Sequence, residues 1–235
     1  VSGLVSATNS LVGSTADDQV GGTGVTALSN GNYVVRSSLW DGSAANVGAV
    51  TWGNGAGGTV GQVAVGNSLI GSTANDQVGG TGVTGLSNGN YVVRSALWDN
   101  SIGAIADVGA VTWGNGTGGT VGAVAIGNSL IGSTANDQVG LSGITALSNG
   151  NYVVRSTQWD NGTATNAGAV TWGNGTTGVT GAVSATNSLV GSSANDEVGG
   201  TGVTALSNGN YVVQSDFWSG AIAFSGAVTW GNGTT

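Results

Sequence analysis

The stretch Leu-Ser-Asn-Gly-Asn-Tyr-Val-Val at residues 28–35 recurs without change at residues 86–93, 147–154 and 206–213. Successive copies begin 58, 61 and 59 residues apart. Self-similarity at a nearly fixed period is the signature of a fold made of equivalent units that pack on one another. The sequence therefore predicts four structural repeats that share the same local chemistry.

Each repeat contains four segments with the composition of β-strands. In the first repeat they are Gly24–Leu28, Asn32–Trp40, Gly48–Gly53 and roughly Val63–Ser72, which are rich in Val and Thr or carry aromatic residues. The Asn-Gly between the first two segments is the sequence of a two-residue hairpin turn, which joins antiparallel neighbours. Four antiparallel strands in a period of this length are typical of one blade of a β-propeller.

The two ends of the sequence correspond to neighbouring segments of the repeat. Asn9–Val12 matches the fourth segment and Ala227–Trp230 matches the third. We therefore expect an all-β fold, a four-bladed β-propeller of four-stranded antiparallel blades. Pairing of the N-terminal strand with the last blade would close the ring, because closure removes unpaired strand edges. A β-solenoid, in which strands pair with the next coil, is the alternative.

This fold prediction also sets the expected domain organisation. Residues 1–235 would form a single propeller domain, and the closed ring would be a monomer. The repeats would span approximately 15–72, 73–133 and 134–192, with the fourth made of 193–235 completed by 1–14.

The composition excludes several classes of function. The chain has no Cys and no His, which rules out disulfides, thiolate or imidazole metal sites and His-activated nucleophiles. The net charge is −8 with only three basic residues, which argues against nucleic-acid binding and adsorption to an anionic membrane. No apolar run is long enough for a membrane span. Four near-equal copies also do not suggest one cleft with two catalytic carboxylates, so we do not expect an enzyme.

Variation in repeat length is confined to one loop per repeat, which we call the variable loop. These loops lie between Trp40 and Val50, Trp98 and Val111, Trp159 and Val170, and Trp218 and Val228. Variable loops on a fixed frame are common binding sites, although exposed loops also accept insertions at little cost. Two of them carry large apolar residues, which would either pack onto the blade or contact a partner: Ile102, Ile105, Ile222 and Phe224.

Tryptophan and aspartate residues flank the variable loops and are the candidate ligand-binding residues. They are Trp40, Trp98, Trp159, Trp218, Asp41, Asp99 and Asp160. A partly exposed Trp beside fixed hydrogen-bonding groups is typical of a sugar-binding site. This pattern indicates a multivalent carbohydrate-binding lectin as one hypothesis, while packing of the Trp side chains in the core is the alternative.

Acidic connectors precede each repeat and would emerge on the same face as the variable loops. They span 15–20, 73–78, 134–139 and 193–198, with Asp17, Asp18, Asp76, Asp137, Asp196 and Glu197. A ring of carboxylates suits Ca²⁺, but the spacing of a known calcium loop is absent, and Asn or Asp commonly stabilise turns through their own backbone. We therefore expect no cofactor, with Ca²⁺ as the weaker hypothesis.

The fourth repeat loses an arginine and an aspartate together. Arg36, Arg94 and Arg155 correspond to Gln214, and Asp41, Asp99 and Asp160 correspond to Ser219. Joint loss of opposite charges suggests the hypothesis that the Arg and the Asp of one repeat are partners.

Three motifs together resemble a known family. Asn-Gly-Asn-Tyr-Val-Val-x-Ser, Gly-Ala-Val-Thr-Trp-Gly-Asn-Gly and Asn-Ser-Leu-Val-Gly-Ser resemble a repeat of unknown function that occurs in arrays in large bacterial secreted or surface proteins, many of them filamentous-haemagglutinin-like. The resemblance covers the whole chain and brings no catalytic residue. It implies an extracellular or cell-surface location in bacteria.

The resemblance favours a non-catalytic scaffold or adhesion repeat module of a bacterial exoprotein. Its partners would be glycans or a host or cell-surface protein. The alternatives are the lectin and a designed or recently amplified propeller without a native function.

Overall fold

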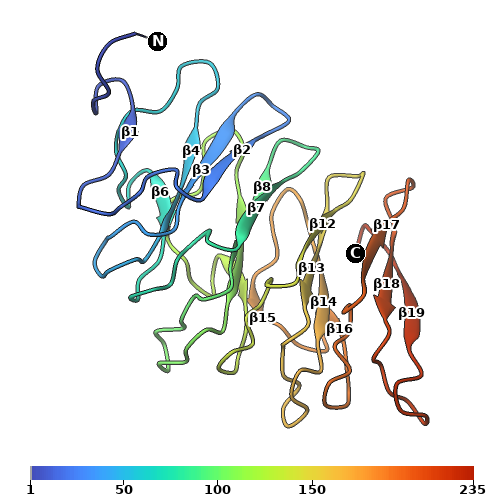
Figure 1. Ribbon diagram of the computed structural model, residues 1–235. Coiled ribbons are helices and arrows are strands. Elements are labelled where there is room, and N and C mark those ends of the chain that lie inside the picture. The colour runs from blue at the N-terminus through green and yellow to red at the C-terminus, as the bar shows by residue number, and fades with distance from the viewer. Residues whose placement is uncertain (1) are drawn as a thin grey trace.

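The structure is a computed structural model in which residues 2–235 are described, and every regular element in that range is a β-strand. The strands form five sheets, which stand in a row from the blue N-terminal end to the red C-terminal end (Figure 1). No helix that could cross a membrane occurs in this range. The expectation of an all-β fold is confirmed.

Four strand positions recur, and we call them A, B, C and D in chain order. The A strands are β2 (Gly24–Ala27), β7 (Gly82–Gly85), β12 (Gly143–Ala146) and β17 (Gly202–Ala205). The B strands are β3 (Tyr33–Ser37), β8 (Tyr91–Ser95), β13 (Tyr152–Ser156) and β18 (Tyr211–Ser215). The C strands are β4 (Ala49–Gly53), β9 (Ala110–Gly114), β14 (Ala169–Gly173) and β19 (Ala227–Gly231). The D strands are β1 (Leu11–Val12), β6 (Ser68–Ile70), β11 (Ser129–Ile131) and β16 (Ser188–Val190).

Strands of one repeat pair antiparallel in the order A–B–C–D, as predicted. In the first repeat Ala27 lies opposite Tyr33, and Ala49 lies opposite both Ser37 and Ile70. The sheet of the fourth repeat contains only β17, β18 and β19. The antiparallel order follows from the short turns, because parallel neighbours would need long crossover connections.

The hairpin between A and B differs in detail from the predicted two-residue turn. The N–H of Leu28 donates to the carbonyl of Asn32 at 2.8 Å, and the N–H of Gly31 donates to that of Leu28 at 3.1 Å. Only Gly31 in this turn has a positive φ, 87°. The connection is therefore a three-residue turn with glycine at the left-handed position, which is the next most common hairpin geometry.

The predicted fourth segment, Val63–Ser72, is not one strand. The Asn67 side chain accepts the N–H of Ala64 at 2.9 Å and donates to the carbonyl of Gln62 at 2.8 Å, which closes a turn inside the segment. A short strand therefore precedes each such turn. These strands are β5 (Gly61–Gln62), β10 (Gly122–Ala123) and β15 (Gly181–Ala182).

These short strands join each repeat to the one before it. β5 pairs in parallel with β1, β10 with β6, and β15 with β11. Parallel pairs between units were expected of the solenoid alternative, whereas antiparallel pairs within a unit were expected of a propeller blade. The structure combines both kinds of pairing.

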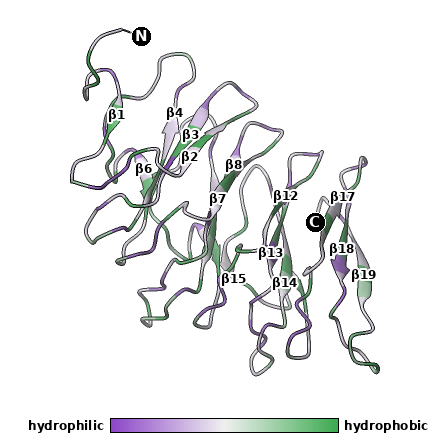
Figure 2. Ribbon diagram, viewed as in Figure 1, coloured by the Kyte–Doolittle hydropathy of each residue, from purple (hydrophilic) through white to green (hydrophobic). Residues whose placement is uncertain are grey.

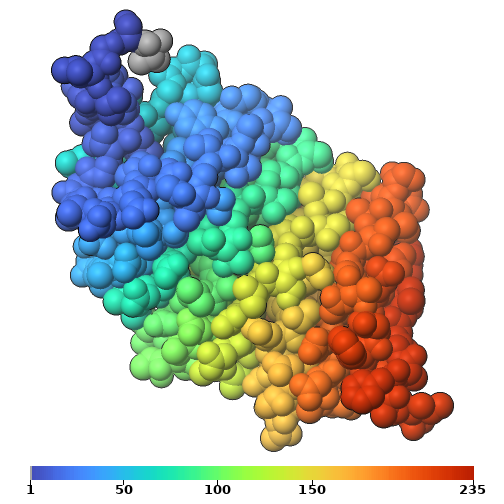
Figure 3. All heavy atoms as spheres, viewed as in Figure 1, coloured from blue at the N-terminus to red at the C-terminus, as the bar shows by residue number. Residues whose placement is uncertain are grey.

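The predicted closure of the ring is not present. The N-terminal strand β1 pairs with β5, and β19 pairs only with β18 within residues 2–235. The blue and red ends of the molecule lie at opposite ends of the row (Figure 3). The physical reason is that parallel pairs such as Leu69 with Gly122 keep consecutive repeats nearly aligned, whereas a four-bladed ring would turn each repeat by a quarter circle.

The hydrophobic core lies in layers between neighbouring sheets. One layer combines Val34 and Val50 of the first repeat with Tyr91 and Val93 of the second. Both faces of an inner sheet are therefore buried, and apolar residues run along its strands (Figure 2). At the outer face of the last sheet, Trp230 is 59% exposed, because no further sheet packs on it among the described residues.

Candidate functional site: variable loops and acidic connectors

The variable loops and the acidic connectors lie at the same end of the repeats, as predicted. In the first junction the N–H groups of Asn75, Gln77 and Val78 donate to the carbonyls of Ala45, Asn46 and Val47 at 3.0–3.1 Å. The same pattern joins 136–139 to 106–108 and 195–198 to 165–167. Each of these three connectors is therefore fixed to the variable loop of the preceding repeat.

Three of the four candidate tryptophans are buried. Trp40, Trp98 and Trp159 are at most 5% exposed, and only Trp218 is half-buried. Trp98 packs in the core layer that contains Ala110 and Val124. These three rings therefore fill the space beneath the variable loops and do not present a flat face to a sugar, because the loops fold over them.

The aspartates that follow these tryptophans shape the variable loops. Asp41 accepts the N–H of Asn46 at 2.7 Å, and Asn46 has a φ of 52°. The carboxylates of Asp99 and Asp160 accept the N–H groups of Asp107 and Asn166 in the same way. Asn and Asp tolerate this left-handed backbone better than most residues, so the three aspartates have a structural role in the loop.

The fourth repeat keeps this loop bond with a different acceptor. Ser219 Oγ accepts the N–H of Phe224 at 3.0 Å. The arginines have other partners, since Arg36 donates to the carbonyl of Gly79 at 3.3 Å. The hypothesis of an Arg–Asp pair within a repeat is therefore wrong: the arginine binds the residue that follows the next connector, and the aspartate binds its own loop.

One buried aspartate in each connector holds the loops together. Asp76 Oδ2 accepts the N–H groups of Ser72 and Thr73 at 2.7 and 2.8 Å, and its Oδ1 accepts the N–H of Asp99 at 3.0 Å. The same three backbone bonds recur at Asp18, Asp137 and Asp196. Both carboxylate oxygens are thus used by the backbone, as the turn interpretation predicted.

Burial and hydrogen bonding act in opposite directions on these carboxylates. Burial raises the pKa of Asp76 and of Asp137, and the backbone donors offset only part of this effect. At Asp18, in the first connector, burial also raises the pKa, but hydrogen bonds from Asp41, Thr15 and Ser14 outweigh it, so that the net pKa is lowered. The second and third connectors therefore differ electrostatically from the first.

The connector carboxylates are not gathered into a metal site. No group of three or more His, Cys, Asp or Glu side chains that could hold a metal ion occurs within residues 2–235. No carboxylate cluster therefore supports the Ca²⁺ hypothesis in this part of the chain.

A second set of repeated polar residues acts between repeats, and sequence reasoning missed it. The amide groups of Asn30 and Asn32 donate to the carbonyl of Gly116 at 2.8 and 2.9 Å. Trp52 Nε1 donates to the same oxygen at 3.0 Å. The signal was present in the sequence, because both asparagines and this tryptophan are unchanged in all four copies.

These bonds join two turns of neighbouring repeats. The turn between A and B of one repeat binds the Trp-Gly-Asn-Gly turn of the next, and the pattern recurs at Gly175 and Gly233. Trp52, Trp113 and Trp172 therefore lie between repeats, and each donates a hydrogen bond across the junction, whereas their counterpart Trp230 is exposed.

The chain was compared with protein families and with curated proteins. A family described as a repeat of unknown function, DUF5650, matches residues 1–22, 27–80, 85–141, 146–200 and 205–235. No curated protein matched the chain. The matches leave only short gaps along the sequence. The chain therefore belongs to the DUF5650 family of repeats of unknown function.

Proposed function

We propose that this chain is a non-catalytic scaffold and adhesion module of a bacterial exoprotein, located outside the cell or on its surface. In this proposal the fixed parts of the repeats form the row, and the variable loops contact a cell-surface protein. The observation that carries the proposal is the division of labour between repeated and variable residues. The repeated polar side chains described above bind backbone groups, which leaves the variable loops as the part that distinguishes one repeat from another.

The variable loops have a composition suited to protein contact. Ile102, Ile222 and Phe224 are exposed on the variable loops. Phe217 and Phe224 lie edge to face with ring centroids 6.5 Å apart. Exposed apolar residues on loops held by a rigid frame are common in protein interfaces, where aromatic side chains contribute much of the affinity.

Adhesion of coated beads to cultured cells under flow tests this proposal. Beads that carry the chain should be retained, and the triple variant Ile102→Ser, Ile222→Ser, Phe224→Ser should fall to the level of uncoated beads. Protease treatment of the cells should have the same effect, because the partner is a protein. The matched control is Val60→Ser with Val121→Ser, since both residues are exposed and lie in the segment that precedes D.

Retention that does not depend on the loop residues would contradict the proposal. If the intact chain were retained no better than bare beads, the adhesion role would be lost. A designed or amplified array without native function would also give this second result.

A carbohydrate-binding lectin is the second candidate, and one observation favours it. A hollow of about 540 Å³ lies beside the first variable loop and is lined by residues that include Trp40, Asp41, Ser43, Gln62 and Val65. An apolar wall with a few polar groups fits a saccharide. Glycan-array binding by the intact chain, lost in Val65→Trp and kept in Val60→Trp, would support this candidate.

Truncation of a candidate tryptophan, such as Trp98→Ala, would not test the lectin. Trp98 is buried, and truncation of a buried Trp costs about 3–5 kcal/mol of stability. Loss of glycan binding would then report unfolding. Absence of any bound glycan with the intact chain would rule the lectin out.

A further inference from the structure

The two inner junctions, between the first and second repeats and between the second and third, are built from the same three contacts. The first is the parallel pair of a short strand with the preceding D strand, as in Gly122 with Leu69. The second is the antiparallel pair of C with D within the preceding repeat, which places the D strand where the short strand can join it, as in Val50 with Leu69. The third is the set of turn-to-turn hydrogen bonds to Gly116. These two copies of the complete junction define what a junction requires.

The last repeat lacks its share of these contacts. Val228 is 74% exposed, whereas its counterparts Val50, Val111 and Val170 are buried. Within residues 2–235, β19 pairs only with β18, and β16 pairs only with β14. One edge of β16, one edge of β19 and one face of the last sheet are thus unpartnered within the described residues.

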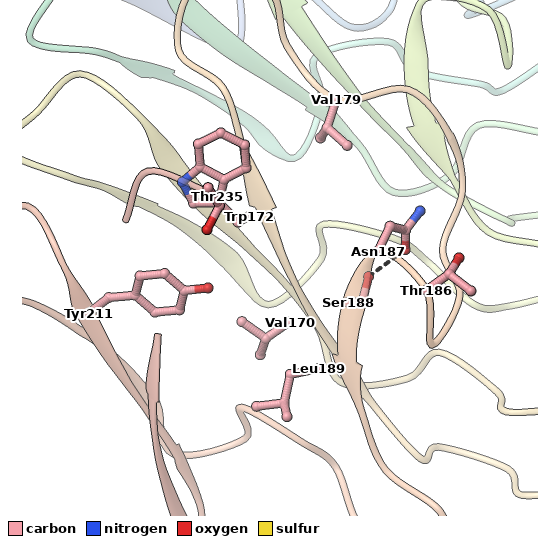
Figure 4. Close-up of a pocket in the computed structure, with 9 residues that line it drawn as sticks. All are labelled: Val170, Trp172, Val179, Thr186, Asn187, Ser188, Leu189, Tyr211 and Thr235. Atoms are coloured by element: carbon pink, nitrogen blue, oxygen red, sulfur yellow. Dashed lines mark hydrogen bonds between the residues drawn. The ribbon is translucent and has the colours of Figure 1, made fainter. Parts of the chain in front are cut away.

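A groove marks the place of the missing strand next to β16. It has a volume of about 420 Å³, and Val170, Trp172, Leu189 and Tyr211 point toward it (Figure 4). At the preceding junction Val179 packs in the core layer that contains Trp113 and Leu130, and β15 pairs with β11 there. The groove is therefore shaped for a segment like 179–183.

The N-terminal segment has the sequence that this groove and edge require. Residues 3–14 read Gly-Leu-Val-Ser-Ala-Thr-Asn-Ser-Leu-Val-Gly-Ser, and residues 181–192 differ from them only at Ala182, the counterpart of Leu4. Val5 is 81% exposed. Its counterparts Val63, Val124 and Val183 are at most 3% exposed.

The N-terminal segment is already folded in the conformation that a junction uses. Asn9 donates to the carbonyl of Leu4 at 2.8 Å and accepts the N–H of Ser6 at 2.9 Å. Asn67 makes the same two bonds at 2.8 and 2.9 Å. A preorganised segment loses little conformational entropy when it binds, which favours association.

We propose that the N-terminal segment of one copy of this chain completes the fourth repeat of a second copy, so that copies associate head to tail. By the register of the inner junctions, Gly3–Leu4 pairs in parallel with Leu189–Val190 of the second copy. Leu11 and Val12 lie opposite Val228 and Ala227. Val5 is buried against Trp218 and Ala227, as Val63 is against Trp40 and Ala49.

The turns of the two copies complete the same contact. Trp230, Asn208 and Asn210 of one copy occupy the positions from which Trp52, Asn30 and Asn32 donate to the next repeat. The acceptor in the other copy is the carbonyl of Gly55, the counterpart of Gly116. Because the two surfaces differ, the contact is heterologous, and each added copy presents a new free end.

Sedimentation velocity over micromolar to millimolar concentrations tests the proposal. The intact chain should form a series of growing species, and added salt should favour them, since each copy carries a charge of −8 and salt screens the repulsion. Val5→Asp and Val228→Asp should each weaken association at least about tenfold, because each buries a carboxylate in the contact. Val121→Asp, a change at an exposed inner position, should not.

A mixture of the two variants gives the sharpest result. The Val5→Asp chain keeps an intact C-terminal face, and the Val228→Asp chain keeps an intact N-terminal segment. Together they should form one-to-one dimers and nothing larger. Melting temperatures of the variants at low concentration should match the intact chain, because both residues are exposed in the single copy.

Several outcomes would overturn the proposal. The intact chain could remain a monomer at every concentration, as a ring closed within one chain would. Association could persist unchanged in Val5→Asp, which would indicate contact between two C-terminal faces. The mixed variants could fail to form dimers.

Discussion

Asn88 shows how one side chain serves two levels of structure. Its Oδ1 accepts the N–H of Asn90 at 3.1 Å and stabilises the hairpin turn, while its Nδ2 donates to the carbonyl of Gly175 in the next repeat at 2.8 Å. Asn208 makes the same turn bond but has no following repeat within residues 2–235. Comparing substitutions at the two residues therefore separates the stability lost with the turn bond from the stability lost with the bond between repeats.

Asn88→Ala should destabilise the chain more than Asn208→Ala does. Both changes remove a turn bond, and only the first also removes a hydrogen bond between repeats. The difference should be about 1 kcal/mol, the net contribution of one hydrogen bond, since Asn90 and Trp113 still donate to the carbonyl of Gly175. Urea unfolding at low protein concentration measures both values. Equal destabilisation by the two changes would show that the junction bonds contribute nothing.

The connector aspartates give stability an unusual dependence on pH. The pKa of Asp76 is raised in the fold, so the folded chain takes up a proton before the unfolded chain does, and the contribution of Asp76 to stability grows as the pH falls through its folded pKa. The pKa of Asp18 is lowered in the fold, so its contribution to stability is fully present above its ordinary pKa of 3.8. That contribution is lost as the pH falls through the folded pKa.

Asp76→Asn and Asp18→Asn should therefore respond oppositely to acid. The loss of stability caused by Asp76→Asn should become larger between neutral pH and the ordinary range of an aspartate. The loss caused by Asp18→Asn should stay constant over that range and shrink only below it. Urea unfolding across the pH series checks both trends, and parallel curves for the two variants would contradict the assignment.

At the scale of elements, the variable loop and the frame around it differ in tolerance. The loop of the second repeat is closed at its ends by the N–H of Gly109, which donates to the carbonyl of Trp98, and by the N–H of Asp107, which donates to the carboxylate of Asp99. Its middle contains the bridge of Asn100 with Ile105 and a bond from the N–H of Ile102 to the side chain of Asn100. In contrast, Gly109 in the frame has a φ of 73°, and a Cβ there would overlap the backbone of Val139.

Exchange of the second variable loop for the first should thus be tolerated, whereas one methyl group in the frame should not. Replacing residues 100–107 by the sequence of residues 42–46 should cost about 1 kcal/mol or less, because loop length has a small entropic effect. Gly109→Ala should cost several times more, through the positive φ and the overlap with Val139. Thermal unfolding compares the two, and a loop exchange as damaging as Gly109→Ala would show that the loop belongs to the frame.

At the scale of the whole molecule, the open row makes stability a property of neighbours. The second and third repeats pack on both faces, while the first and fourth each pack fully on one. In such quasi-one-dimensional arrays, the ends open before the middle.

Amide hydrogen exchange at low concentration should show this gradient directly. Amides of β8, β9, β13 and β14 should exchange most slowly, and those of β1 and β19 fastest. Small-angle scattering of the same sample should give an elongated particle. Uniform protection together with a disc-shaped particle would indicate a closed ring and contradict the row.

The sequence alone determined the repeat, its four strand positions and the antiparallel order within a repeat. These features follow from local chemistry, because Gly31 fixes the A–B turn and the Val-rich segments favour strands. It also placed the connectors beside the variable loops. Two local details were wrong for local reasons: the turn is one residue longer than Asn-Gly suggests, and Asn67 interrupts the fourth segment.

Only the tertiary structure decided between a ring and a row, and between a ligand platform and a packed core for Trp40, Trp98 and Trp159. The rotation between repeats depends on contacts such as Asn30 with Gly116, which join residues of different repeats. No single repeat contains both partners, so the periodic pattern is compatible with either arrangement. The sequence also does not decide whether the Trp side chains are buried, because their burial depends on how the variable loop folds back over them.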